Sequence, residues 1–224
     1  MVDPVNAIAM SDTFTILLGG ELEVTDRLKT AIDGSRVIAA DGGMRHAAAL
    51  GVVPELWVGD FDSTDPSLFV RYDAVPRLTF PAAKAMTDGE IAVEQALERG
   101  ARRLVFVGGL GGTRSDHAFQ HLVQGAALSA KGFSVLLTSG SEEAVPLLPG
   151  ELFLDLPAGS LFSILGLDDL KGLTIENARY PLAGFDVPFG SARTLSNIAE
   201  GRVRFALEEG KAIVLARPYD FTGA

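Results

Sequence analysis

The sequence predicts a parallel α/β half followed by an all-β half. In the first half, short apolar runs alternate with segments whose apolar residues recur at helical spacing. After about residue 141 the helical spacing disappears, and short apolar runs separated by turns remain. Alternating strands and helices are typical of a mostly parallel sheet with helices on both faces. We therefore expect a parallel, Rossmann-like α/β domain at residues 1–140 and a C-terminal all-β sandwich domain at residues 141–224.

The expected elements of the first half follow from composition and spacing. Its strands are short, β-branched or aromatic, and bounded by Gly, Pro or Asp. They are residues 14–18, 36–40, 55–58, 77–80, 103–107 and 133–137, with helices expected at 24–33, 43–51, 90–100 and 116–132. The last three helices end at Gly51, Gly100 and Gly132, a residue type that suits the left-handed end of a helix.

The second half is expected to consist of strands and turns. Strands are expected at 151–157, 160–166 and 173–182 and as a pair within 201–218. Turns are expected at Pro157–Gly159 and Glu208–Gly210. No internal repeat and no low-complexity segment interrupts this pattern.

The composition limits the classes of function. The chain has 224 residues, of which 47% are hydrophobic and 21% charged, so it can bury a sizeable core. No run approaches about 18 apolar residues, and the first residues lack the features of a secretory signal, so we expect no membrane partner. The absence of cysteine excludes disulfides and favours a cytoplasmic protein. The net charge of −10 argues against nucleic acid as a partner.

Glycines and acidic residues gather where the expected strands end. In an open parallel sheet, ligands bind beyond the carboxyl ends of the strands. A single such residue is most often part of a turn or cap, but four strand ends together favour a binding site. The strand ends carry Gly19 and Gly20, then Asp41, then Asp60 and Asp62, and finally the segment 108–117 with Gly111, Gly112, Arg114, Asp116 and His117.

The segment TDGE at residues 87–90 adds a third carboxylate. Thr87 and Glu90 fit a capping box, which leaves Asp88 at the first helical position and able to point out of the helix end. With Asp60 and Asp62, Asp88 makes an oxygen-only donor set that suits Mg²⁺. Mg²⁺ held by a few carboxylates usually also binds substrate phosphates. The set therefore indicates an enzyme that acts on a phosphate ester or a nucleotide.

The glycine run GGLGGTR at residues 108–114 fits the same interpretation. Its backbone N–H groups can approach phosphates, and Arg114 can add a charged, two-pronged donor. Alone the run is weak evidence, because it matches neither the P-loop nor the G-x-G-x-x-G fingerprint.

Five motifs follow one another along the chain: ADGG (40–43), GDFDS (59–63), TDGE (87–90), GGTRSDH (111–117) and LSN (195–197). Taken together and in this order, they resemble the thiamine pyrophosphokinase family. The resemblance spans nearly the whole chain, including the change from the α/β half to the β half. It implies an enzyme that uses Mg²⁺ and ATP, in which the thiamine hydroxyl attacks the β-phosphorus, AMP leaves and thiamine diphosphate forms. It also implies a homodimer with thiamine near the subunit interface.

The resemblance also implies roles for single residues. It places Asp60, Asp62 and Asp88 around Mg²⁺ as the metal-binding and catalytic residues. It places Asp41, Arg114, Asp116 and His117 near the ATP phosphates and the nucleotide, and Ser196 and Asn197 against thiamine.

Two departures from the family pattern affect this assignment. Ala85 stands where the family commonly has an aspartate, so a carboxylate near the metal or the phosphates is missing. Thr113 is an added residue in the glycine loop, so we expect that loop and Arg114 to be displaced slightly from their place in the family.

Two other functions are open at this stage. DFDST at residues 60–64 matches the D-x-D-x-T pattern of haloacid-dehalogenase-like phosphatases, and Asp168–Asp169 imitates their later metal-binding pair. Against this, two expected strands precede Asp60, whereas that class places its nucleophile after the first. The second alternative is a non-catalytic nucleotide- or thiamine-binding protein, suggested by Ala85. His46, His121 and Trp57 are expected to be surface or packing residues.

Overall fold

The parallel half of the protein is built on six strands. The computed structural model describes residues 11–62, 64–80 and 86–223. The strands of this half are β1 (Thr13–Leu17), β2 (Arg36–Ala40), β3 (Leu56–Gly59), β4 (Arg77–Thr79), β5 (Arg103–Val107) and β6 (Ser134–Thr138). They lie in the order β4-β3-β2-β1-β5-β6, and every neighbouring pair is parallel. The parallel pairing that the sequence predicts is present, and the carboxyl ends of all six strands lie on one edge.

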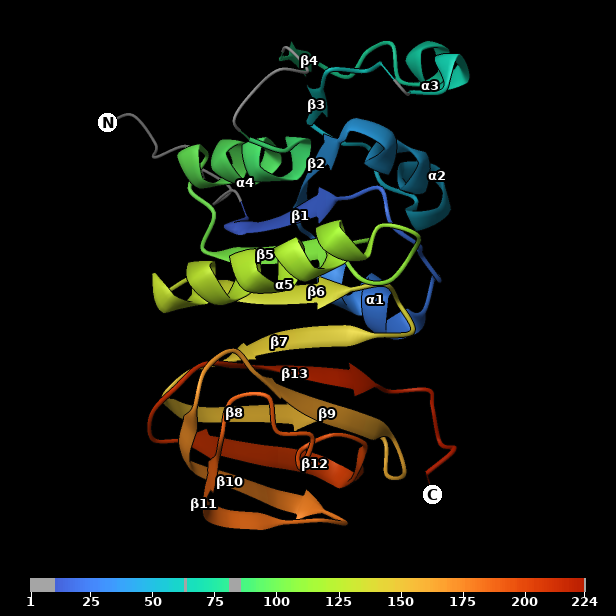
Figure 1. Cartoon of the computed structure of the whole chain (residues 1–224). Coiled ribbons are helices and arrows are strands. Elements are labelled where there is room, and N and C mark those ends of the chain that lie inside the picture. The colour runs from blue at the N-terminus through green and yellow to red at the C-terminus, as the bar shows by residue number, and fades with distance from the viewer. Residues whose placement is uncertain (1–10, 63, 81–85, 224) are drawn as a thin grey trace, which may run out of the picture.

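Helices cover both faces of this sheet (Figure 1). They are α1 (Asp26–Ile32), the 3-10 helix η1 (Asp41–His46), α2 (Ala47–Leu50), α3 (Pro66–Arg71), α4 (Asp88–Glu98) and α5 (Ser115–Ala130). Alternate residues of each strand point to opposite faces. Phe14 and Ile16 therefore enter the core beneath α4 and α5, whereas Leu17 enters the core beneath α1 and η1.

In the second half, the described residues 141–223 form strands joined by turns and loops. Its strands are β7 (Glu143–Leu147), β8 (Gly150–Asp155), β9 (Leu161–Gly166), β10 (Leu170–Ala178), β11 (Leu182–Val187), β12 (Asn197–Leu207) and β13 (Ala212–Arg217). β7, β13 and β9 extend the first sheet, and β12 pairs with β9 at one end and with β8 and β10 along the rest of its length. Phe162, Phe205 and Val214 belong to a separate buried cluster of this half.

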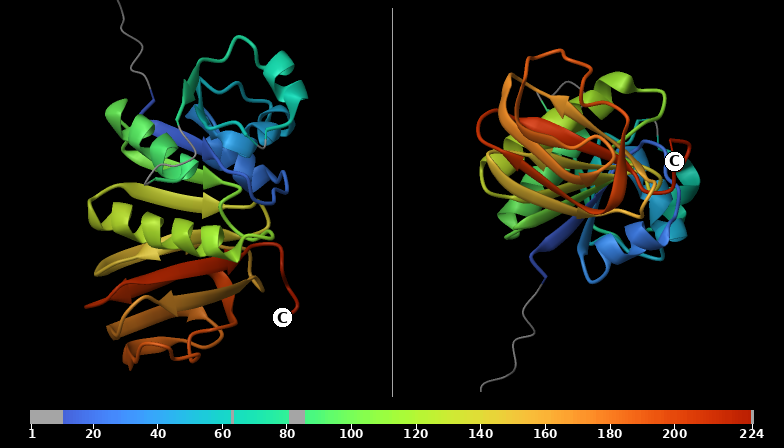
Figure 2. Two further views of the ribbon diagram at one scale, coloured as in Figure 1. Left: turned by 45° about the horizontal axis from the view of Figure 1, so that its top comes forward. Right: turned by 90° about the horizontal axis from the view of Figure 1, so that it is seen from below.

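Hydrogen bonding continues from one half into the other. β6 pairs antiparallel with β7, so a single path of hydrogen-bonded strands runs through both halves, which Figure 2 shows stacked one upon the other. The sequence gives no sign of this continuity, because it predicts the halves as separate units. It also misses α3 and β7 and joins part of β10 to the start of β11. The domain boundary and the sandwich form stay predictions.

Side chains also join the two halves. Arg27 on α1 donates two hydrogen bonds of 2.7 Å to Glu143 on β7 and a third to the backbone oxygen of Asp155. Within the β half, Arg217 at the end of β13 donates to Glu142 at 2.8 Å. Among the described residues, no helix is long and apolar enough to cross a membrane.

Candidate active site

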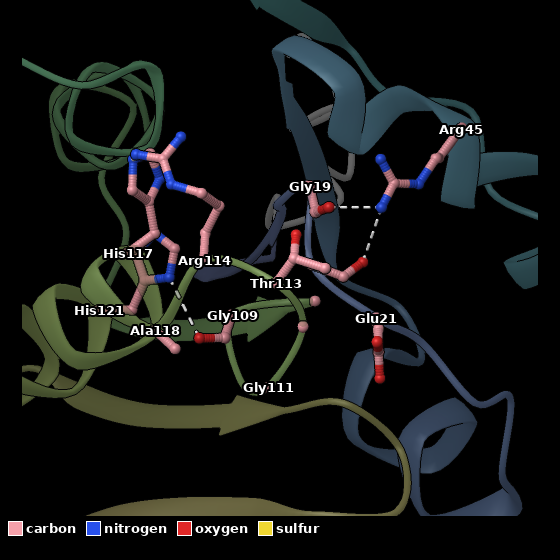
Figure 3. A pocket seen from close by; sticks show the side chains of 13 residues that line it. Gly19, Glu21, Arg45, Gly109, Gly111, Thr113, Arg114, His117, Ala118 and His121 are labelled. Atoms are coloured by element: carbon pink, nitrogen blue, oxygen red, sulfur yellow. Dashed lines mark hydrogen bonds between the residues drawn. The ribbon is translucent and has the colours of Figure 1, made fainter.

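The glycine segments that follow β1 and β5 line a cavity at the carboxyl edge of the sheet. The cavity has a volume of about 320 Å³ and is shown in Figure 3. Its lining includes six residues predicted from the sequence, namely Gly19, Gly20, Gly111, Gly112, Arg114 and His117. The N-terminus of α5 begins at Ser115, directly after this loop, and the first N–H groups of a helix attract anions.

Close backbone approach explains why two of these positions are glycines. The backbone N–H of Gly20 donates to the carbonyl oxygen of Gly108 at 2.9 Å, so the two loops lie against each other. A Cβ atom at Gly20 would clash with that oxygen. Gly108 has a φ of 72°, a left-handed conformation that glycine adopts without steric cost. Larger residues at either position would push the two loops apart.

Arg45 on η1 ties the first loop in place. Its Nη2 donates to the carbonyl oxygens of Gly19 and Gly20, the latter at 2.9 Å (Figure 3). The residue lines both this cavity and the neighbouring acidic one. A guanidinium carries five N–H donors, so these two bonds leave donors for an anion.

Two histidines form hydrogen bonds to the same two loops. His46 Nε2 lies 3.0 Å from the Gly20 carbonyl oxygen, and His121 Nδ1 lies 3.1 Å from that of Gly109. Carbonyl oxygens only accept, so each of these ring nitrogens carries a proton. Burial lowers the pKa of both histidines, and neighbouring Arg45 lowers that of His46 further. Both rings are therefore neutral at pH 7 and act as hydrogen-bond donors to the loops.

Arg114, Asp116 and His117 form one hydrogen-bonded group at the start of α5. Arg114 donates to both carboxylate oxygens of Asp116, at 3.0 and 2.9 Å, and to His117 Nε2 at 2.7 Å. The Arg114 hydrogen bond holds the pKa of Asp116 well below its ordinary value. Arg114 and His117 line the glycine cavity, whereas Asp116 lies outside it and orients Arg114. The added Thr113 also lines the cavity.

A second cavity, of about 570 Å³, lies beside the first and is acidic. Asp41, Asp60 and Asp88 line it, and Gly19, Arg45, His117 and His121 line both cavities. The position of Asp41 is fixed by two bonds, one from Thr64 Oγ1 to its carboxylate at 2.8 Å and one from Trp57 Nε1 to its backbone oxygen at 2.9 Å. Trp57 is fully buried, as its expected packing role requires, and its hydrogen bond also fixes the backbone at Asp41.

Local structure explains how Asp88 and Asp60 reach this cavity. The predicted capping box is present, since Thr87 Oγ1 accepts from the Glu90 N–H and Glu90 accepts from the Thr87 N–H. This places Asp88 at the first position of α4. Asp60 follows β3 directly, and its carboxylate accepts the N–H of Asp62 at 3.2 Å. Asp62 itself is exposed and does not line the cavity.

The donor set of the acidic cavity fits Mg²⁺ together with a phosphate ligand. In the described part of the chain, no three Asp, Glu or His side chains are grouped closely enough to hold a metal ion by themselves. Asp60 and Asp88 nevertheless supply two carboxylates to one cavity. Mg²⁺ usually takes one or two carboxylates and completes its shell with water and substrate phosphates. Of the three predicted metal ligands, Asp60 and Asp88 line the cavity and Asp62 does not, while Ala85 lies outside the described residues.

Ser196 and Asn197 lie apart from both cavities. Ser196 is exposed and has a φ of 56°, and its N–H donates to Ser163 Oγ. Asn197 is buried, and its amide bonds the backbone N–H and carbonyl of Tyr180 at 3.1 and 2.8 Å. Within one chain, the predicted thiamine residues are therefore not brought together with the predicted phosphate and metal residues.

The sequence does not single out Arg45, and it assigns His46 and His121 only to surface or packing roles. All three contact the glycine loops. Arg45 lies four positions after Asp41, one helical turn beyond a strand end, and a basic residue there is the one sequence signal for its position. Nothing in the sequence signals the histidine contacts, because they depend on how η1 and α5 pack against the loops.

Comparison with known proteins shows which family this chain is similar to. The family model for the catalytic domain of thiamin pyrophosphokinase matches residues 29–137, which include the strand ends of β2, β3 and β5. The thiamine pyrophosphokinase of Bacillus subtilis is 26% identical over 212 residues, covering 91% of this chain and 97% of that protein.

Solved structures show the same fold. The crystal structure of thiamine pyrophosphokinase from Bacillus subtilis has a TM-score of 0.79 at 24% identity and covers 93% of this chain and 100% of its own. That from Geobacillus thermodenitrificans has a TM-score of 0.78 at 24% identity, covering 94% and 99%. The enzyme from Candida albicans has a TM-score of 0.75 at 12% identity, covering 92% and 88%.

The sheet edge and the glycine loops define the class of protein, an α/β protein with glycine-lined and acidic cavities at the carboxyl edge of a parallel sheet. Over residues 29–137 the chain matches the catalytic domain of thiamin pyrophosphokinase, and it resembles that family over most of its length.

Proposed function

We propose that this protein transfers the diphosphate group of ATP to the hydroxyl of thiamine, giving thiamine diphosphate and AMP. The observation that carries this proposal is the pair of adjoining cavities at the carboxyl edge of the sheet. One is lined by glycine loops, arginines and a helix N-terminus, which suit phosphates. The other is lined by Asp60 and Asp88, whose carboxylates suit the Mg²⁺ ion that accompanies the phosphates of ATP.

The proposed roles follow from position. Asp60 and Asp88, with Asp62 beside them, hold Mg²⁺, which when bound neutralises charge on the β- and γ-phosphates. The N–H groups of the Gly111–Gly112 loop and of the first turn of α5 bind phosphate oxygens, and Arg45 and Arg114 add positive charge. Phosphoryl-type transfer needs in-line positioning and charge neutralisation more than covalent help from the protein.

The proposed division of labour follows the two halves. Residues 1–140 bind ATP and Mg²⁺, and residues 141–224, as a β-sandwich, bind thiamine through Ser196 and Asn197. Those two residues lie apart from the glycine and acidic cavities of their own chain, since Asn197 and Ser196 line two other, separate cavities. This separation supports a homodimer in which thiamine lies between the α/β half of one subunit and the β half of the other.

The phosphatase alternative has little support in the geometry. Asp168 accepts the Lys211 N–H at 2.6 Å and Asp169 accepts the Phe189 N–H at 2.7 Å, so both hold turns in the β half. Neither lines the cavity of Asp60. The non-catalytic alternative rests on Ala85 and is decided by turnover.

The test is the rate of AMP release from Mg-ATP with and without thiamine, with excess chelator as a control. We expect release that requires both thiamine and Mg²⁺. Tight binding of thiamine or ATP without AMP release would favour the non-catalytic alternative. Hydrolysis of a simple aryl phosphate without thiamine would favour the phosphatase.

A further inference from the structure

A third cavity lies at the junction of the two halves and continues from the glycine cavity. It has a volume of about 650 Å³. Its lining comes from the loop after β1, the loop after β5, the β6–β7 turn and the segment after β13. Glu21 and Gly111 line both this junction cavity and the glycine cavity. A ligand whose phosphates lie on the glycine loop therefore has room to extend into the junction.

Strand direction explains why the C-terminal segment reaches this edge. β7 is antiparallel to β6, and β13 is antiparallel to β7, so β13 runs in the same direction as β6. Its carboxyl end accordingly lies at the same edge as those of the parallel strands, as Figure 1 shows. This brings Tyr219, two residues beyond β13, to the rim of a cavity whose opposite wall belongs to the α/β half.

The lining has the chemistry of a nucleoside site. Tyr219 is 47% exposed and offers an aromatic face, and Ser139 and Ser141 offer hydroxyl groups. Glu21 lies where the two cavities meet, and a carboxylate in that position can accept hydrogen bonds from ribose hydroxyls. Two of the other carboxylates, Glu142 and Asp220, lie 2.8 and 3.7 Å from Arg217, which offsets part of their charge.

We propose that the junction cavity binds the nucleoside of ATP, with Tyr219 stacked on the base and Glu21 bonded to the ribose. This proposal rests on the proposed function and names the residues that recognise its nucleotide. It makes the β half of a chain part of the ATP site of that same chain. Arg217, Tyr219 and Asp220 then belong to the nucleotide site, although they lie outside every motif of the sequence.

The in-line geometry of the reaction separates this site from that of thiamine. The attacking and leaving oxygens lie on opposite sides of the transferred phosphorus. If AMP leaves toward the junction cavity, the thiamine hydroxyl approaches from the other side of the glycine loop, where Asp60 and Asp88 lie. The acidic lining would also attract a cation such as thiamine, and the experiment distinguishes these two occupants.

The test uses Tyr219→Ala, Tyr219→Phe and Glu21→Gln in the full chain. We expect Tyr219→Ala to raise the KM for ATP about tenfold, because base–aromatic stacking is lost. The KM for thiamine and the inhibition constant of inorganic tripolyphosphate, which lacks a nucleoside, should not change. Tyr219→Phe keeps the ring and should retain the wild-type KM. Glu21→Gln should raise the KM for ATP more than that for 2′-deoxy-ATP.

Matched controls are Phe153→Ala, an aromatic residue that is 44% exposed on β8, and Glu94→Gln on the exposed face of α4. Neither lines the junction cavity, and neither should alter the KM for ATP. A higher KM for thiamine with an unchanged KM for ATP would overturn the proposal in favour of an acceptor site. An unchanged KM for both substrates in Tyr219→Ala would also overturn it. If the wild type releases no AMP, the proposed function fails, and calorimetric binding of AMP to the same variants still tests the cavity.

Discussion

Arg45 serves two cavities with one side chain. It holds the carbonyl oxygens of Gly19 and Gly20, and it lines both the glycine cavity and the acidic cavity. In a chain with a net charge of −10, a cation fixed between them offsets the repulsion between bound phosphates and the aspartates. Arg45 therefore determines both the position of the Gly19–Gly20 loop and the charge between the two cavities.

Arg45→Met should therefore lower kcat/KM by about a hundredfold or more, because a charged donor near the transferred phosphate is lost. Arg45→Lys should recover only part of the activity, since an ammonium cannot reproduce the geometry of the two carbonyl bonds. Arg102→Met, on the exposed loop before β5, is the matched control and should leave the rate unchanged. Wild-type turnover in Arg45→Met at saturating Mg-ATP would contradict this role.

The carboxylates give a second prediction. Asp60→Asn and Asp88→Asn keep side-chain size and should preserve the fold, yet lose at least about a hundredfold in turnover, because charge on the phosphates is no longer neutralised. Asp62→Asn shows whether the exposed third carboxylate joins the metal when substrate binds. The measurement is turnover against Mg²⁺ concentration, with circular dichroism as the check on folding. Unchanged Mg²⁺ profiles in all three variants would remove the metal assignment.

Stability should depend on pH through His46 and His121. Both are half-buried, and burial lowers their pKa values, so the folded protein takes up these protons at a lower pH than the unfolded chain, whose histidines have the ordinary pKa of 6.5. Hence the free energy of unfolding should fall as the pH drops below 6.5. Paired carboxylates such as Asp116 and Asp186 have lowered pKa values, so they reduce the free energy of unfolding only at lower pH, below their ordinary pKa of 3.8. Urea denaturation across this range should show a shallower fall for His46→Gln, which keeps a donor but does not titrate. An identical slope in that variant would contradict the account.

The sequence predicts where a residue lies when its position depends only on the end of a strand or the start of a helix. Gly20, Asp60 and Asp88 could be found because a strand end or a helix start fixes where each lies. Arg45 and His121 could not, because their contacts depend on the packing of η1 and α5 against loops distant in the sequence. The same limit applies to Tyr219, which reaches the edge only through the pairing of β13.

At the scale of elements, the join between the halves is the main difference between prediction and structure. Alternating patterns predict most strands and helices, and the capping box before α4 is confirmed. The short strand β7 escapes prediction, although its pairing with β6 and β13 connects the halves. Sequence periodicity describes each segment by itself and carries no information about which segments pair.

The Arg27–Glu143 pair tests this join. Glu143 retains only 13% of its side-chain exposure, so removal of Arg27 leaves a largely buried carboxylate without this partner. Arg27→Ala should lower the free energy of unfolding by about 1–3 kcal/mol. Glu143→Gln in the same background should recover part of the loss, because a neutral amide is less costly to bury. Equal stability of Arg27→Ala and wild type in chemical denaturation would show that the pair does not stabilise the join.

At the scale of the whole molecule, we propose that the reaction uses residues of two chains. Ser196 lies in the β half and Asp60 in the α/β half, and they line different cavities of one chain. In a two-fold dimer, each of two equivalent composite sites would take one residue from each chain. The dimer and this arrangement are proposals that a mixing experiment can decide.

Asp60→Asn and Ser196→Arg, a charged and bulky block to thiamine, should each be nearly inactive as pure dimers. In a mixed dimer one site carries both changes and the other carries neither. Random one-to-one mixing makes half the dimers mixed, each with one intact site, so about a quarter of wild-type activity should return. No recovery, with mixed dimers shown by mass spectrometry, would mean that each site lies within one chain.

The most direct test of the central claim follows the β-phosphate of ATP through the reaction. With ATP labelled at the β-phosphorus, Mg²⁺ and thiamine, transfer of the terminal two phosphates as one unit predicts label in thiamine diphosphate and unlabelled AMP in equal amount. Label found instead in ADP or in inorganic phosphate, with no thiamine diphosphate formed, would contradict the assignment.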